Sequence, residues 1–157
     1  MPELVEFRLT DPADPVAREL VRAMEEEIER LYADRQGSIH SVPAPAEQMR
    51  PPSGAFLLVL DGEEPVGCGG LKPLGAETGE IKRMYLRPEA RGRGIAAGLL
   101  AALEEWAREL GYARVRLDTG DRQAAAKHLY ESRGYREIPD YNGNTAASYW
   151  YEKRLQS

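Results

Sequence analysis

Residues 5–9 alternate between apolar and charged side chains, which is the period of a half-buried β-strand. The alternation stops at Thr10-Asp11-Pro12. From Val16 to Leu31 apolar residues recur every three or four positions, which predicts an amphipathic helix capped by Asp14 or Asp11. The chain therefore begins with a strand and a long helix.

Prolines interrupt any regular element between Gly37 and Gly54, leaving room for a short helix at Ala46–Met49 within a surface loop. Three apolar runs follow this loop, and a hairpin-type Asp-Gly pair separates the first two. They cover Ala55–Leu60, Pro65–Leu71 and Glu80–Leu86. We interpret them as an antiparallel meander.

The second half alternates between helices and strands. Apolar positions from Ile95 to Leu110 fall on one helical face, and Gly111 ends that helix. A strand around Val115 and Leu117 follows, and the next helix, Ala124–Arg133, ends at Gly134. A last strand is expected at Tyr149–Leu155. The pattern predicts an α+β fold.

Length and composition fit one globular domain over residues 1–157, since domains usually run to roughly 100 to 200 residues. Hydrophobic residues make up 42% and charged residues 30% of the chain, which excludes a disordered or fibrous class. The net charge of −5 gives no general attraction for nucleic acid or anionic membranes. Any anionic ligand must be bound by a local group of residues.

The single cysteine, Cys68, excludes an intramolecular disulfide framework and a cysteine-rich zinc site. Two histidines without clustered carboxylates argue against a catalytic metal, so no metal is expected. The start of the chain lacks the pattern of a signal peptide, and the longest apolar run, Ile95 to Leu103, has nine residues, too few to span a bilayer. We expect a soluble, cytoplasmic protein.

A glycine-rich turn precedes the helix at Ile95. The sequence Arg91-Gly92-Arg93-Gly94 places two glycines and two cations where unpaired backbone amides open a helix. That arrangement binds phosphate groups, because the amides and the helix dipole attract an anion while glycines let it approach the backbone. We therefore predict an anion site, the alternative being that the glycines only form a turn.

The run Arg91-Gly92-Arg93-Gly94-Ile95-Ala96 resembles the motif of the GNAT superfamily of acyl-CoA-dependent N-acyltransferases. Its surroundings match too, with a strand at Glu80–Leu86 before it and Leu129–Tyr135 after it, and the resemblance extends from Phe7 to Leu155. It implies a central, mostly antiparallel mixed sheet of six to seven strands flanked by helices. In that fold a splayed strand pair holds CoA.

The resemblance also implies how acetyl-CoA is bound. The turn amides would hold the CoA pyrophosphate, with arginine side chains near the phosphates, and the exposed backbone of the preceding strand would pair with the pantetheine arm. Gln123 stands where many family members have Asn, so the contacts there depart from the family pattern. The implied cofactor-binding residues are Met84, Tyr85, Leu86, Arg91, Gly92, Arg93, Gly94, Ile95, Ala96 and Gln123.

By the same resemblance, the reaction is direct transfer of an acetyl group to a primary amine in a ternary complex. An alkyl amine with a pKa of about 10 arrives protonated, so a base is needed. Glu80 matches a catalytic glutamate of several family members, acting directly or through water. The alternative is a solvated carboxylate at the end of a strand.

Two further groups would stabilise the charges that develop during the reaction. The Met84 amide would face the carbonyl oxygen as charge develops on it. Tyr130 matches the tyrosine that gives a proton to the departing CoA thiolate. Its alternative role is that of an aromatic residue packed in the core.

Competing interpretations come from the same glycines. Gly92 to Ala97 also reads G-x-G-x-x-A, and Asp118 lies 24 residues past Gly94, as in a dinucleotide-binding fingerprint of an oxidoreductase. Residues 87–91, however, separate the preceding strand from the first glycine. A non-catalytic acyl-CoA sensor is the second alternative.

The acceptor is expected to be an amine of a small molecule or a peptide, with no nucleic-acid or membrane partner. The polar segment Asp140–Asn144 is either part of the acceptor pocket or a hairpin loop. By resemblance, the stretch Ser41–Pro52 would also lie near the acceptor. A homodimer stays open, because dimers are common among similar proteins.

Overall fold

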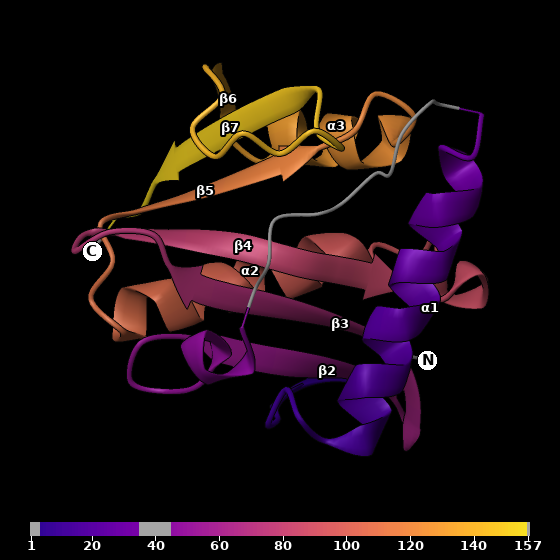
Figure 1. Ribbon diagram of the computed structural model, residues 1–157. Helices are drawn as coiled ribbons and strands as arrows, with labels where there is room; N and C mark the ends of the chain where they lie inside the picture. Colours follow the sequence, from indigo (N-terminus) through magenta and orange to yellow (C-terminus); the bar gives the residue numbers. More distant parts are fainter. Residues whose placement is uncertain (1–3, 35–44, 157) are drawn as a thin grey trace.

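The computed structural model describes residues 4–34 and 45–156, which form one seven-stranded sheet with helices on both faces (Figure 1). In chain order the elements are β1 (Val5–Leu9), α1 (Pro15–Leu31), the 3₁₀ helix η1 (Ala46–Met49), β2 (Ala55–Asp61), β3 (Glu64–Pro73), β4 (Thr78–Leu86), the 3₁₀ helix η2 (Pro88–Ala90), α2 (Ile95–Glu109), β5 (Arg114–Thr119), α3 (Ala124–Ser132), β6 (Arg136–Ile138) and β7 (Tyr149–Arg154).

The strands lie in the order β1-β2-β3-β4-β5-β7-β6. Every neighbouring pair is antiparallel except β4 and β5, which are parallel. The prediction of a mixed, mostly antiparallel sheet is therefore confirmed, and such a sheet excludes the doubly wound fold of the dinucleotide alternative. β6 was not predicted, because three largely exposed residues carry no readable period.

Two hydrophobic cores lie on opposite faces of the sheet. α1 covers one face, and α2 and α3 cover the other (Figure 1). Successive residues of β2 serve both cores: Leu57 and Val59 face α2, while Phe56, Leu58 and Leu60 face α1. Because β2 is buried on both faces, its sequence is a continuous apolar run and not an alternating one.

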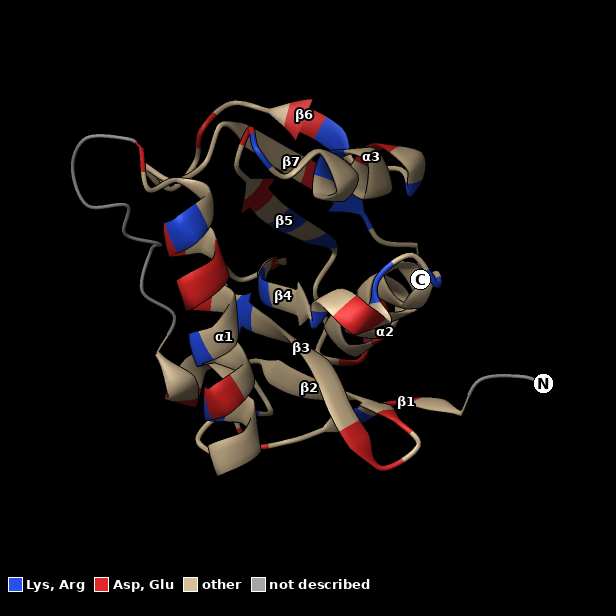
Figure 2. Cartoon of the chain, turned by 90° about the vertical axis from the view of Figure 1, so that its right-hand side faces the viewer, with Lys and Arg blue, Asp and Glu red and all other residues tan. Residues whose placement is uncertain are grey.

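α1 is capped by Asp14, whose Oδ1 accepts a hydrogen bond from the Val16 amide at 2.9 Å. Asp11 instead accepts from the Ala13 amide within the preceding turn. Acidic and basic segments alternate along α1 (Figure 2), and three of its glutamates pair with arginines on or just after β4. These exposed pairs orient the helix across β4 more than they stabilise it.

β4 and β5 form a splayed pair. They are paired only from Thr78 to Glu80 and from Arg114 to Arg116, and they then diverge (Figure 1). Within the part of the chain that the structure describes, the edge of β4 that faces β5 therefore has no strand partner from Ile81 onward. A bulge opposite β3 adds to the distortion, since the register shifts between Cys68 and Gly70 and Arg83 has a φ of 59°. The predicted splayed strands are present.

Within the described ranges, no helix has both the length and the apolar character that crossing a membrane requires.

Candidate active site

The predicted phosphate turn has the backbone shape that an anion site needs. Gly92 and Gly94 have φ values of 77° and 78°, and no atom of the described residues lies within 4 Å of where a side chain would begin at either residue. Gly94 is the N-cap of α2, and no side chain among residues 4–34 and 45–156 caps that helix. Because the first amides of a helix have no partner within it, those of Ile95 and Ala96 are available to a ligand.

The arginines of the turn bind carboxylates of the protein itself. A single nitrogen of Arg91, Nη2, donates to both carboxylate oxygens of Glu27, at 2.7 Å to Oε1 and 2.8 Å to Oε2. Arg91 Nε also donates to the Leu86 carbonyl at 3.0 Å, which joins the turn to the end of β4. Arg93 pairs with Asp61 at 3.0 Å. The phosphate contacts expected of these side chains would require them to leave their present partners.

The predicted residues of β4 lie next to this turn. Leu86 is buried, and the Tyr85 ring lies 5.8 Å from the Arg91 guanidinium carbon. Met84 packs against the core beneath α2. Ile95 belongs to the same core, so its side chain anchors α2 while its amide faces the turn. The structure thus brings the turn and the open edge of β4 together.

Tyr130 is both a core residue and a polar group at the splay. Its ring packs against Tyr135 and Tyr151 with centroid distances of 5.8 and 6.0 Å. Its hydroxyl donates to the Met84 sulfur at 3.9 Å, which is a weak acceptor. Burial raises the pKa of the Tyr130 phenol, and the charge of Asp118 raises it further. The phenol therefore keeps its proton and has a weak partner.

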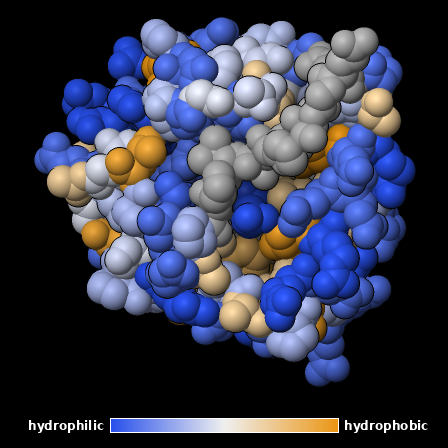
Figure 3. All heavy atoms as spheres, viewed as in Figure 1, coloured by the Kyte–Doolittle hydropathy of each residue, from blue (hydrophilic) through white to orange (hydrophobic). Residues whose placement is uncertain are grey.

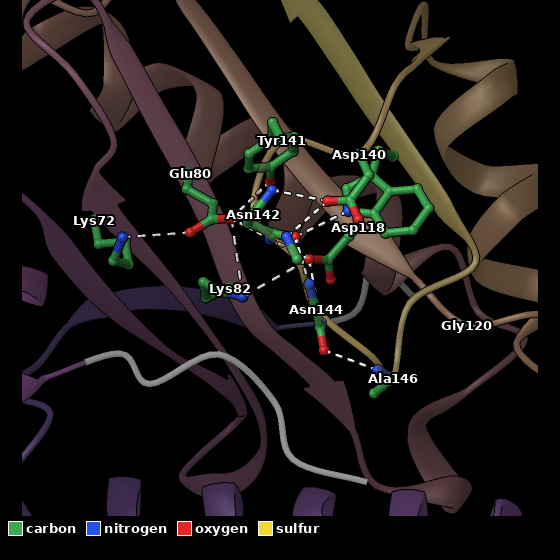
Figure 4. A network of polar contacts seen from close by, with 12 residues as sticks. Lys72, Glu80, Lys82, Asp118, Gly120, Asp140, Tyr141, Asn142, Asn144 and Ala146 are labelled. Atoms are coloured by element: carbon green, nitrogen blue, oxygen red, sulfur yellow. Dashed lines mark hydrogen bonds and ion pairs between the residues drawn. The ribbon is translucent and has the colours of Figure 1, made fainter.

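Glu80 lies inside a polar network (Figure 4). It is 1% exposed, so the alternative of a solvated carboxylate is wrong. Tyr141 donates to its Oε2 at 2.6 Å and Asn142 to the same oxygen at 3.1 Å, while Lys72 donates to Oε1 at 3.4 Å. Burial and the neighbouring Glu80 charge both raise the pKa of the Tyr141 phenol, so Tyr141 remains the donor of this pair.

The network continues from β4 to β5 through Asp118. Asn142 Nδ2 donates to Asp118 Oδ2 at 2.6 Å, and Lys82 Nζ lies 3.9 Å from both Glu80 Oε2 and Asp118 Oδ2. Asn142 is held in turn by Trp150, whose indole N–H donates to its Oδ1 at 2.9 Å. The loop between β6 and β7 thus closes over the point where β4 and β5 separate (Figure 4).

Gln123 is bound within its own loop. Its Oε1 accepts from the Gly120 amide at 3.0 Å and from the Thr119 hydroxyl at 3.4 Å, at the start of α3. The side chain therefore shapes the link between β5 and α3.

Sequence reasoning missed most of the polar network. Lys72, Glu80 and Lys82 share one face of the sheet, because Lys72 pairs with Glu80 across strands and Glu80 and Lys82 are two residues apart. The spacing of Glu80 and Lys82 is visible in the sequence, and so is the polar segment Asp140–Asn144, but no local pattern links the two. In the sequence, Asp118 fits only the dinucleotide alternative. Part of the stretch Ser41–Pro52, residues 41–44, lies outside the described residues.

Comparisons with known proteins agree with this geometry. The model of the acetyltransferase (GNAT) family matches residues 21–135. An uncharacterised N-acetyltransferase of Bacillus subtilis (strain 168) is 35% identical over 123 residues, covering 75% of this chain and 80% of that protein. A crystal structure from Klebsiella pneumoniae, assigned as an acyl-CoA N-acyltransferase, has a TM-score of 0.80 at 28% identity and covers 98% of this chain and 99% of that one.

A GNAT acetyltransferase from Elizabethkingia anophelis, crystallised with acetyl-CoA bound, shares the fold with a TM-score of 0.66 at 18% identity, covering 96% of this chain and 98% of that one. The residues present here fit such a ligand, since the open glycine turn suits a diphosphate and the unpaired edge of β4 suits an extended amide chain. The chain belongs to the GNAT family of acetyltransferases, and acetyl-CoA is its acyl donor.

Proposed function

We propose that the protein transfers the acetyl group of acetyl-CoA directly to a primary amine of a small molecule or peptide, with both substrates bound at once. Acetyl-CoA supplies an activated thioester and a thiolate leaving group. The observation that carries the proposal is the buried Tyr130 hydroxyl, which lies beside the splayed strands and whose one hydrogen-bond partner among the described residues is the Met84 thioether sulfur.

Binding would use two backbone surfaces. The amides from Gly92 to Ala96 would accept the diphosphate, and the free edge of β4 from Met84 to Leu86 would pair with the pantetheine amides. Arg91 and Arg93 would exchange Glu27 and Asp61 for phosphate oxygens, which are acceptors of similar strength. Gln123 would contribute to cofactor binding indirectly, by holding the loop between β5 and α3 in shape.

The amine must lose a proton before it attacks. Glu80 is our candidate for the base, and it would act through water, because both of its oxygens are engaged. Distance favours the same route, since Met84 lies four residue steps along the strand from Glu80, which is roughly 13 Å. Lys82 and Asn142 would keep the carboxylate in place.

Acetyl transfer then forms one bond and breaks another. The nitrogen forms a bond to the acetyl carbon while the Met84 amide donates to the carbonyl oxygen. The C–S bond then breaks, and Tyr130 gives its proton to the sulfur and regains one from the acylated nitrogen. Because burial keeps the phenol protonated, Tyr130 is ready to donate when the thiolate leaves.

A thiol-release assay with acetyl-CoA and a panel of amines tests this mechanism. Tyr130→Phe keeps the ring that packs against Tyr135 and removes only the hydroxyl, so kcat should fall by roughly 10²-fold while KM for acetyl-CoA stays the same. Glu80→Gln should lower kcat on a similar scale. The matched control is Tyr112→Phe, which removes a hydroxyl bonded to the Ser53 carbonyl away from the splay.

If Tyr130→Phe and Glu80→Gln react at the wild-type rate, Tyr130 and Glu80 do not have the proposed roles. Tight binding of acetyl-CoA without thiol release for any amine would favour the sensor instead.

We also propose a cytoplasmic location, since the single cysteine is a buried free thiol.

A further inference from the structure

A hollow of about 370 Å³ lies on the face of the sheet that α1 covers. It is framed by α1, η1, β2 and β4, and Figure 3 shows it beside the polar surface of α1 with hydrophobic residues at its floor. Its size is within the range of small-molecule sites. The lining residues are Pro12, Arg18, Val21, Arg22, Glu25, Ala46, Met49, Phe56 and Arg83.

The charge of this hollow is opposite to that of the whole chain. Its lining contains three arginines and one glutamate, a formal charge of +2, whereas the protein carries −5. Arg18 and Arg22 are four residues apart on α1, so they project from the same face of the helix. Arg83 reaches the hollow from the bulge of β4 and lies 3.7 Å from Glu25.

Two of these arginines are available to a ligand. Among the described residues, the side chains of Arg18 and Arg22 make no hydrogen bond or ion pair, in contrast to Arg91 and Arg93 in the phosphate turn. A guanidinium binds a carboxylate through two parallel hydrogen bonds, which makes arginine the preferred partner for that group. The hollow therefore suits an organic anion.

The remaining lining is apolar. Val21, Met49 and Phe56 offer a surface for a hydrocarbon or aromatic group, and Phe56 and Met49 are buried. A fully hydrated ion such as free phosphate would gain nothing from this part of the hollow. A ligand with both a carboxylate and an apolar group would use the whole site.

The hollow adjoins the splayed strands through β4. Arg83 directly precedes Met84, whose amide is the proposed partner of the acetyl carbonyl, so their Cα atoms are about 3.8 Å apart. An α-amino acid carries its amine and its carboxylate on one carbon. A carboxylate held at Arg83 would therefore keep the amine close to the thioester.

We propose that the acceptor is an α-amino acid with an apolar or aromatic side chain, whose carboxylate is bound by Arg18, Arg22 and Arg83. This inference rests on the proposed acetyl transfer and names its substrate class. The side chain of the amino acid packs on Val21, Met49 and Phe56, and the free amine faces the end of β4.

Matched acceptors test the role of the carboxylate. L-Phenylalanine is compared with 2-phenylethylamine, and L-leucine with isoamylamine, so that each pair differs only in that group. We expect kcat/KM to be at least about tenfold higher for the amino acids, the scale of one charge-assisted hydrogen bond. Equal values within each pair would overturn the proposal.

Variants of the arginines test whether the preference for amino acids arises in the hollow. Arg22→Gln, alone or with Arg18→Gln, should lower kcat/KM for the amino acids about tenfold and leave the two amines unchanged. Arg30→Gln is the control, because Arg30 is an exposed residue of the same helix outside the hollow. An equal loss for amines and amino acids would contradict a carboxylate site. A raised KM for acetyl-CoA would instead assign these arginines to a CoA phosphate and overturn the inference.

A binding measurement separates this inference from the proposed reaction. If no acceptor releases thiol, the proposed transfer fails, and calorimetry with L-phenylalanine in the presence of CoA still tests the hollow. Binding that Arg22→Gln weakens about tenfold supports the site. Absence of binding to the wild-type protein, or equal binding to the variant, overturns it.

Discussion

Close contacts at single residues hold α1 against the loop after β5. Gly120 lies directly under the Tyr32 ring, which is 2% exposed, and the Tyr32 hydroxyl accepts a hydrogen bond from the Arg122 amide at 3.1 Å. A methyl group at Gly120 would overlap that hydroxyl and lie 2.7 Å from Tyr32 Cζ. Only glycine permits this approach of the ring to the backbone.

Gly120→Ala is therefore expected to destabilise the protein by about 2 kcal/mol, because the buried ring must move and weaken its hydrogen bond. Gly75→Ala is the matched control, since an added Cβ there would have no atom of the structurally described chain within 4 Å and the φ of Gly75 is not positive. Urea unfolding midpoints measured at a constant m-value compare the two. Equal midpoints for both variants would contradict the close contact.

At the scale of elements, the turn before α2 combines two separable properties of glycine. Gly94 needs a positive φ, and it also leaves the space in which a diphosphate would lie. Gly62 in the β2–β3 hairpin shares the first property, with a φ of 64° and open space around it, and lies outside the turn before α2. Comparing the two positions distinguishes backbone strain from ligand binding.

Gly94→Ala and Gly62→Ala should each cost about 1 kcal/mol of stability, because both place an L residue in the left-handed region. Only Gly94→Ala should weaken CoA binding, by about tenfold or more, since its methyl group would enter the proposed diphosphate site. Calorimetric titration with CoA measures the affinity and urea unfolding measures the stability. An equal loss of affinity in both variants would count against the turn as the binding site.

Across the whole molecule, several titratable groups are buried in their neutral forms. Burial raises the pKa of the Cys68 thiol to about 12. It also raises the pKa of the Tyr130, Tyr135 and Tyr141 phenols, and carboxylates nearby raise them further. The folded state therefore keeps protons that the unfolded chain releases near pH 9 to 10.

The free energy of unfolding should therefore be highest below about pH 9 and should fall as the pH rises further. A folded pKa above the unfolded one means that folding retains the proton, so each such group costs up to about 1.4 kcal/mol per pH unit once its unfolded form is ionised. Urea unfolding between pH 8 and pH 10.5 measures the slope. Cys68→Ala should make the slope shallower, and an unchanged slope would contradict the raised thiol pKa.

Much of the fold could be predicted from the sequence, because its signals are local. The period of residues 5–9, the helical faces of α1 and α2, and the glycines that end helices each act within a few positions, and the structure has these elements at nearly the expected bounds. The phosphate turn could be predicted for the same reason, since Gly92 and Gly94 directly precede the first turn of α2. The assignment of residues 1–157 to one domain, the homodimer and the roles of the site residues stay predictions.

Most helices and strands, the glycine turn and the family could be inferred from the sequence alone, because each depends on residues that are neighbours in the chain; the short strand β6 could not. Which side chains meet at the site depends on the folded arrangement. Glu80 and Asn142 are 62 residues apart, and Arg22 and Arg83 lie on different elements, so no local period relates them. Their meeting depends on the crossing of α1 over the sheet and on the splay of β4 from β5, which packing of the two cores fixes.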